Sequence, residues 1–151
     1  MYLNQYSRVD WISDNPEELN YWIPIGVSPV FRYMKYAPNS PGHHVHYDAP
    51  FKNPDNPLIR TLKSGVLYLT TNNCNTRFVY DKQGDIPFID RDHTDWDRPA
   101  TSIETYSSIK SEAGDCALFD HQVAHDVSPN DDPNVRIIIR FDIIYQAIGR
   151  M

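Results

Sequence analysis

The sequence predicts a mainly β protein in which two antiparallel sheets form a double-sheet jelly roll, also called a double-stranded β-helix, with a short N-terminal helix. Two observations support this fold class. Short apolar or alternating segments are separated by turn residues, and the chain is rich in aromatic residues and proline, with 10 tyrosines, 6 phenylalanines and 12 prolines. A length of 151 residues suits one domain, so residues 1–151 are expected to share a single core.

The first part of the chain is expected to contain one short helix followed by strands. Residues 14–19 (DNPEEL) combine capping residues with the proline and acidic residues that suit a first helical turn. Prolines and a glycine within 24–29 interrupt the chain before a strand at about 30–37, whose mixed faces predict that one of them lines a polar cavity. Segment 62–71 is expected to be the most buried strand and to form a hairpin with a strand at 76–80.

The second part of the chain is expected to begin with a long loop and continue as strands. Residues 81–105 are mostly polar around the lone Trp96, and a loop of this length is either functional or simply solvated. Strands are expected at 107–111 and 116–119, and a long final strand is expected at 135–145, where β-branched and aromatic residues predominate.

Composition argues against several classes of function. The net charge of -6 is spread along the chain without a basic cluster, which disfavours binding to nucleic acid or to an anionic membrane surface. No apolar run approaches the ~20 residues of a membrane span, and the N-terminus lacks the pattern of a signal peptide. We therefore expect a soluble cytoplasmic protein. Cys74 and Cys116 lack metal-type spacing and suit a reducing compartment, although a single disulfide is the alternative.

The segment His46-Tyr47-Asp48 is the strongest candidate for a functional site. Side chains at i and i+2 of an extended segment point to the same face, so this imidazole and carboxylate can share one metal ion. A second histidine would complete a 2-His-1-carboxylate set, which is diagnostic of non-haem Fe(II) oxygenases. His121 and His125 are both candidates for that ligand, and His44 is a weaker one because it lies two residues before His46.

Six motifs occur in the order in which they occur in the 2-oxoglutarate- and Fe(II)-dependent dioxygenases of the prolyl 4-hydroxylase type. The chain resembles that family from about residue 30 to residue 145. The motifs are 32–38 (RYMKYAP), 46–48 (HYD), 65–69 (GVLYL), 113–119 (AGDCALF), His125 and 136–145 (RIIIRFDIIY). Each motif alone is common, whereas all of them in this order form a specific signal.

The resemblance implies an iron site and a site for the co-substrate. Iron is expected on His46, Asp48 and His125, because His125 precedes the last strand at the distance that the family's pattern shows. Arg136 is expected to bind the far carboxylate of 2-oxoglutarate, since a guanidinium presents a planar fork of donors that matches a carboxylate. Tyr36 and Tyr68 stand where family members place tyrosines that hydrogen-bond this co-substrate.

Arg140 lies on the same strand face as Arg136, which makes it a second inward cation in the predicted co-substrate site. The alternative is a structural ion pair, for example with Asp142, because buried arginines are commonly paired.

The function implied by the resemblance is hydroxylation of an unactivated C–H bond, with release of succinate and CO2. The target is expected to be a prolyl or other residue in a peptide or protein, or a small molecule. The cofactors are Fe(II), 2-oxoglutarate and O2, with ascorbate as an additional one that the resemblance suggests. The segment before His46 and the loops 52–57 and 81–105 are expected to contact the substrate.

Two other functions remain open at this stage. One is a non-catalytic jelly-roll binding module, and the other is a cupin-like metalloprotein in which His43, His44 and His46 belong to a different ligand set. Arg136 distinguishes them from an oxygenase, because neither needs an anchor for an oxo-acid on the last strand.

Overall fold

The structure is a computed structural model that describes residues 6–9, 19–82 and 97–150. Within these ranges the chain is mainly β, as predicted, and one 3₁₀ turn, η3 (Ser102–Glu104), precedes β7. The strands are β1 (Tyr6–Val9), β2 (Leu19–Val27), β3 (Arg32–Tyr36), β4 (His43–His46), β5 (Ile59–Tyr68), β6 (Asn72–Val79), β7 (Thr105–Ser111), β8 (Cys116–Asp120), β9 (His125–Val127) and β10 (Arg136–Arg150).

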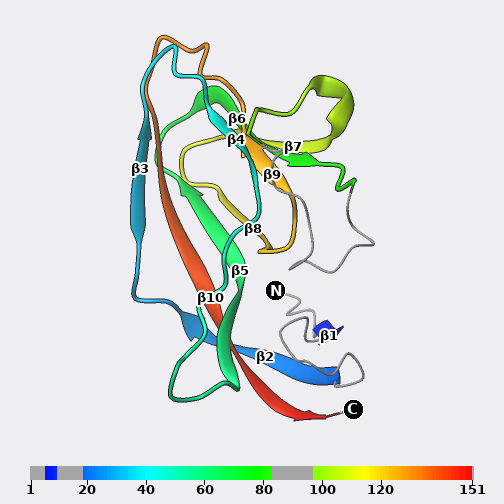
Figure 1. Ribbon diagram of the computed structural model, residues 1–151. Helices are drawn as coiled ribbons and strands as arrows, with labels where there is room; N and C mark the ends of the chain where they lie inside the picture. The colour runs from blue at the N-terminus through cyan, green and yellow to red at the C-terminus, as the bar shows by residue number, and fades with distance from the viewer. Residues whose placement is uncertain (1–5, 10–18, 83–96, 151) are drawn as a thin grey trace.

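The strands of the described ranges form two antiparallel sheets. The larger sheet has six strands in the order β1-β2-β10-β5-β8, and β3 pairs with β10 beyond the end of β2. The smaller sheet has four strands in the order β4-β9-β6-β7. Figure 1 shows β10 running the length of the larger sheet beside β5, while β4, β6, β7 and β9 lie together near one end.

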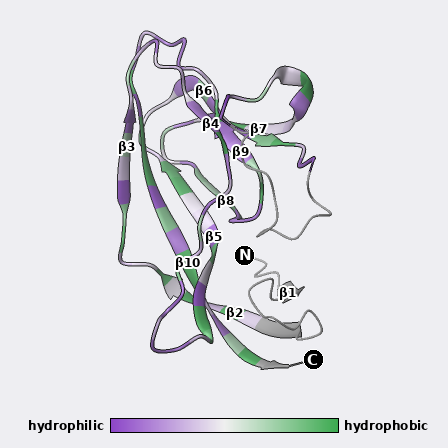
Figure 2. Cartoon of the chain, viewed as in Figure 1, coloured by the Kyte–Doolittle hydropathy of each residue, from purple (hydrophilic) through white to green (hydrophobic). Residues whose placement is uncertain are grey.

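The inner face of β10 is charged as well as apolar. Arg136, Ile138, Arg140 and Asp142 alternate with half-buried residues, and all four are buried. Figure 2 shows the resulting succession of hydrophilic and hydrophobic stretches along the strand. A strand with this inner face needs partners for its charges, because an unpaired charge in a low-dielectric interior is costly.

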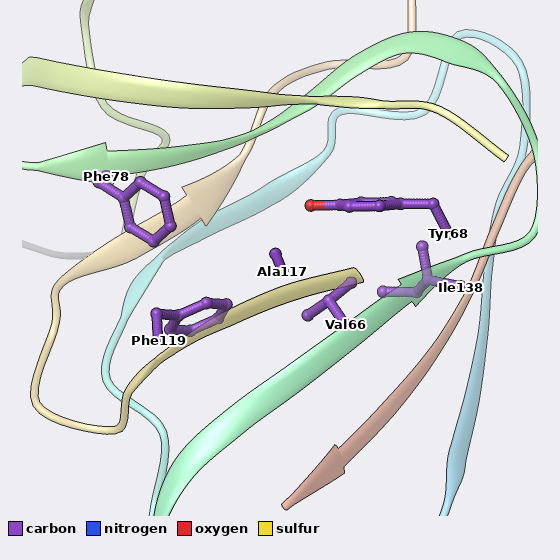
Figure 3. Close-up of a cluster of buried hydrophobic side chains, with 6 residues drawn as sticks. All are labelled: Val66, Tyr68, Phe78, Ala117, Phe119 and Ile138. Atoms are coloured by element: carbon purple, nitrogen blue, oxygen red, sulfur yellow. The ribbon is translucent and has the colours of Figure 1, made fainter. Parts of the chain in front are cut away.

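The main apolar cluster joins the two sheets. Its buried residues come from β5, β6, β8 and β10, and Figure 3 shows their side chains converging between the strands. Phe78 and Phe119 pack edge to face with ring centroids 5.3 Å apart, an arrangement that aromatic quadrupoles favour. The cluster consists of Val66, Tyr68, Phe78, Ala117, Phe119 and Ile138. Burial of each large side chain contributes roughly 1.5–3 kcal/mol, so this cluster fixes the sheets relative to one another.

The predicted hairpin between 62–71 and 76–80 is wrong. Strand β5 pairs with β10 and β8 in the larger sheet, whereas β6 pairs with β7 and β9 in the smaller one. Both edges of β5 are therefore filled, and the chain crosses between the sheets at 69–71. Seven of the ten residues of β5 are buried, but the short strand β9 is buried at all three of its residues, so the predicted segment is not the most buried strand by fraction.

Strand β2 occupies a segment in which Pro24 and Gly26 were expected to break the chain. The pairing of β2 with β10 shifts register at this point, between Ile144 and Tyr145, and Tyr145 is paired with Pro24. Proline is tolerated at such an irregularity because its missing N–H is not required by a regular ladder. Most of the predicted helix, residues 14–18, lies outside the described residues, as does Trp96 in the predicted loop.

The described ranges contain no helix long and apolar enough to cross a membrane. Cys74 is buried, Cys116 is exposed, and both are free thiols.

Gly65 provides a test of the packing on the outer side of the larger sheet. It is paired with Phe141 across β5 and β10, and an added Cβ would lie 2.2 Å from the ring of Phe141. We expect Gly65→Ala to lower the free energy of unfolding by about 1–3 kcal/mol, because the ring must leave its position. Urea denaturation measures the change. In a Phe141→Ala background the same substitution should cost much less, and an equal cost in both backgrounds would contradict this explanation.

Candidate metal centre and adjoining cavity

Three of the predicted ligands lie together in the structure. His46 on β4 is paired directly with His125 on β9, and Asp48 follows β4 by two residues. One ligand atom from each residue lies within 4.8 Å of the other two. Asp48 Oδ1 is 3.9 Å from His46 Nε2, and Asp48 Oδ2 is 3.7 Å from His125 Nε2. The smaller sheet therefore assembles the 2-His-1-carboxylate group from segments almost 80 residues apart in the sequence.

Both imidazoles are oriented by the backbone. His46 Nδ1 is 2.9 Å from the carbonyl oxygen of His44, and His125 Nδ1 is 2.9 Å from that of Val123. A carbonyl oxygen only accepts, so each Nδ1 carries the proton and donates it, and each Nε2 keeps its lone pair free. Burial lowers the pKa of both histidines, which favours the neutral form that a metal ligand requires.

Asp48 is held by two donors from the larger sheet. The hydroxyl of Ser64 donates to Oδ2, and the guanidinium of Arg140 lies 3.0 Å from Oδ1. Arg140 also donates to the Ser64 hydroxyl at 3.1 Å, so the three side chains form a closed buried network. Outer contacts of this kind fix the direction of a carboxylate ligand. Ser64 was not identified from sequence, although it precedes Val66 and Tyr68 on the same face of the strand.

His121 is directed away from the three-residue group. Its Nε2 lies 3.1 Å from Asp142 Oδ1, and Arg140 contacts the same carboxylate oxygen at 3.0 Å. The carbonyl oxygen of His121 accepts a hydrogen bond from the backbone N–H of Asp48. Of the two distal candidates, the structure thus brings His125 to the other ligands and uses His121 to support Asp142 and the backbone beside Asp48.

The remaining histidines lie near the group without joining it. His44 is exposed, and its carbonyl oxygen orients the ring of His46. His43 borders the adjoining cavity, with its ring centroid 4.6 Å from that of His46. Burial lowers the pKa of His43, so it too is largely neutral near pH 7.

A cavity of about 250 Å³ adjoins the three ligands. One wall is formed by the matched faces of β3 and β10, where the register pairs Tyr36 with Arg136, Met34 with Ile138, and Arg32 with Arg140. The prediction that one face of the first strand lines a cavity agrees with this wall, although the cavity is lined by apolar as well as charged side chains.

Arg136 is the most notable group in the cavity wall. Its side chain is fully buried, yet only one of its nitrogens has a hydrogen-bond partner: NH2 donates to Thr76 Oγ1 at 2.9 Å, while Nε and NH1 have none. The rings of Tyr36 and Tyr68 flank the guanidinium, with centroids 5.0 and 5.4 Å away. A buried cation with unused donors is unfavourable unless an anion completes it, so this end of the cavity is suited to bind a carboxylate.

The two predicted tyrosines differ in their access to the cavity. Tyr36 lines it, and burial raises the pKa of its hydroxyl, which stays protonated as a donor. Tyr68 is fully buried, and its hydroxyl donates to Thr76 Oγ1 at 3.0 Å. Thr76 accepts from both Tyr68 and Arg136, which leaves its own O–H to donate into the cavity that it lines. Sequence reasoning missed Thr76, because a single threonine in a strand carries no distinctive pattern.

The donor set fits a divalent transition metal. Two neutral imidazoles and one carboxylate suit Fe(II), and three protein ligands leave coordination positions for small molecules. Comparison of the sequence with protein-family models and with curated proteins finds no match. The chemistry of the site therefore rests on its own residues.

Replacement of the two distal histidines separates a ligand from a supporting residue. We expect His125→Ala to weaken the binding of Fe(II) or Co(II) by at least about 100-fold, because it removes a ligand whose Nε2 faces Asp48. His121→Asn, which keeps a donor for Asp142, should change metal affinity only severalfold. Anaerobic calorimetric titration measures both, with circular dichroism to verify folding. Strong metal binding by the His125 variant would assign the third ligand elsewhere.

Proposed function

We propose that the protein is an Fe(II)- and 2-oxoglutarate-dependent dioxygenase with a jelly-roll fold that hydroxylates an unactivated C–H bond. One observation carries the proposal: the incompletely paired guanidinium of Arg136 lines the same small cavity as His46, Asp48 and His125. A metal group alone is compatible with many functions. Three candidate metal ligands next to a buried arginine that can bind a carboxylate are what an enzyme needs to bind a chelating oxo-acid.

The residues fit the two ends of the co-substrate. A dicarboxylate that chelates the metal through its keto-acid end would place its other carboxylate against Nε and NH1 of Arg136, the two unused donors. The hydroxyl of Thr76 and that of Tyr36 border the same end of the cavity and supply further donors. Tyr68 acts through Thr76, which it holds in place by its hydrogen bond.

Held by His46, Asp48 and His125, Fe(II) with 2-oxoglutarate and O2 would supply the oxidant: one oxygen atom would enter the C–H bond of the substrate, the other would enter succinate, and CO2 would be released. The protein orients and protects these groups. Backbone carbonyls keep each Nε2 directed at the proposed metal position, and Ser64 and Arg140 fix the direction of the Asp48 carboxylate. Apolar side chains such as Val66, Phe119 and Ile138 line the cavity and limit the access of water.

The family resemblance suggests a prolyl or other residue of a peptide as the target and ascorbate as an auxiliary cofactor. A non-catalytic binding module without an anionic ligand needs neither the three-residue metal group nor the incompletely paired Arg136, so the oxygenase is preferred. The cupin-like alternative would use His43 or His44 as a ligand, and neither belongs to the three-residue group found among the described residues.

An anaerobic titration tests the proposed function directly. Fe(II) and 2-oxoglutarate, added together, should give a visible metal-to-ligand charge-transfer band that neither gives alone. Admission of air should then release succinate in a metal-dependent manner. A protein that binds the metal but shows neither the band nor succinate release is not a 2-oxoglutarate oxygenase. That result would favour the cupin-like alternative.

Arg136→Met separates the stability of the fold from co-substrate binding. The substitution replaces a buried, incompletely paired cation by an apolar side chain of similar length, so the metal-free protein should unfold at an equal or higher temperature. Binding of 2-oxoglutarate to the metal-loaded protein should weaken by about 10- to 100-fold, the equivalent of one charge-assisted pair. Thermal denaturation and the charge-transfer titration measure the two effects. Loss of stability with unchanged affinity would show that Arg136 is structural.

A further inference from the structure

The cavity has a second end that carries two arginines, away from the proposed site for the far carboxylate of the co-substrate. Along the β3–β10 pairing, Arg136 stands opposite Tyr36 at one end, and Arg140 stands opposite Arg32 four residues further along. Four residues of extended strand span about 13 Å, so the two ends are distinct. Met34 and Ile138 form an apolar band between them, and all six of these side chains line the cavity.

In the metal-free protein Asp48 and Asp142 balance the two arginines of this end, because both carboxylates contact Arg140, but Arg32 has no ion-pair partner of its own among the described residues. Arg32 is exposed and makes no ion pair or hydrogen bond with any described residue. Arg140 is buried and contacts Asp48 and Asp142 through NH2, while its Nε has no partner. A metal on Asp48 would compete with Arg140 for that carboxylate, because both are cations. The Arg32–Arg140 end thus becomes more strongly cationic when the site is loaded.

A charge count over the cavity leads to the same result. Three arginines and one aspartate line it, a formal charge of +2 with neutral histidines, in a protein whose net charge is -6. The divalent metal and the dianionic co-substrate cancel one another. Asp142, which contacts Arg140 from behind the lining, offsets one further charge. At least one positive charge remains for the second substrate to meet.

We propose that the substrate carries a carboxylate, bound by Arg32 and Arg140, close to the C–H bond that is hydroxylated. This proposal rests on the proposed function and narrows its substrate to a small carboxylic or amino acid. The size of the cavity supports a small substrate. Its volume of about 250 Å³ lies below the roughly 300–1,000 Å³ of sites for drug-sized ligands, and the cavity must also hold the co-substrate. Arg140 stands beside the metal ligand Asp48, so an acid bound there lies next to the reacting position.

The test compares free acids with their neutral amides. The probes are the proteinogenic amino acids and short dicarboxylic acids, each paired with its amide, and a set of peptides with and without acidic residues. Their binding to protein loaded with Mn(II) and 2-oxoglutarate is measured by calorimetry. Their stimulation of succinate release is measured separately with Fe(II) in air. At least one free acid should bind and stimulate turnover, and its amide should do so at least about tenfold less well.

Arg32→Gln is the decisive variant, since Arg32 is exposed and holds no described partner, so the fold does not depend on it. It should raise the KM and Kd for the acid by about tenfold, which corresponds to ~1.4 kcal/mol, and leave the amide unaffected. Lys35→Gln is the matched control, because Lys35 is an exposed cation of the same strand that does not line the cavity. It should change neither constant.

The outcomes separate the two proposals. If the wild-type protein forms no Fe(II)–2-oxoglutarate complex, the proposed function fails and the substrate proposal fails with it. If the complex forms but no acid is preferred over its amide, only the substrate proposal is overturned. Stimulation by peptides alone, or equal behaviour of the Arg32 variant and the wild type, overturns it as well.

Discussion

The antiparallel pairing of β10 with β3 on one edge and β5 on the other is the constraint on which the rest of the structure depends. This register decides which residues of the last strand face inward, and a shift by one residue would exchange the inner and outer faces. Arg136 and Arg140 are thereby carried into the space between the sheets, one beside Thr76 and the other beside Asp48. The position of both cations is a property of the sheet, and no flexible loop has to place them.

The burial of charged side chains on β10 is energetically unfavourable, and this unfavourable free energy differs from one charged residue to the next. Arg140 and Asp142 neutralise one another and engage Asp48 and His121, so most of the buried charge is compensated within the protein. Arg136 is different, because two of its nitrogens are buried without a partner. An apolar residue there would stabilise the fold, which is why an incompletely satisfied cation in a cavity wall indicates a binding role. These two unpaired donors are unfavourable at a position where a bound anion would satisfy them.

Sequence reasoning anticipated the parts of this molecule that depend on local pattern. The i, i+2 spacing of His46 and Asp48 and the alternation along the last strand correctly grouped residues by face. It failed where pairing is non-local: the chain crosses between sheets after β5, and β2 includes Pro24 because a register shift accommodates it. Ser64 and Thr76 were missed for the same reason, since their partners Asp48 and Arg136 lie 16 and 60 residues away.

Contacts from both parts of the fold hold Asp48, one of the three candidate metal ligands. Its main chain follows β4 of the smaller sheet by two residues. Its carboxylate contacts Ser64 and Arg140 of the larger sheet. Each oxygen receives one of these donors, and each retains a lone pair that can face the two Nε2 atoms. The two donors restrict the rotation of the carboxylate, so this candidate ligand is already oriented in the metal-free protein. Displacement of one sheet relative to the other would disrupt this arrangement, and the apolar cluster around Tyr68 and Phe78 is what prevents it. The packing of the core and the geometry of the candidate metal centre are therefore one constraint.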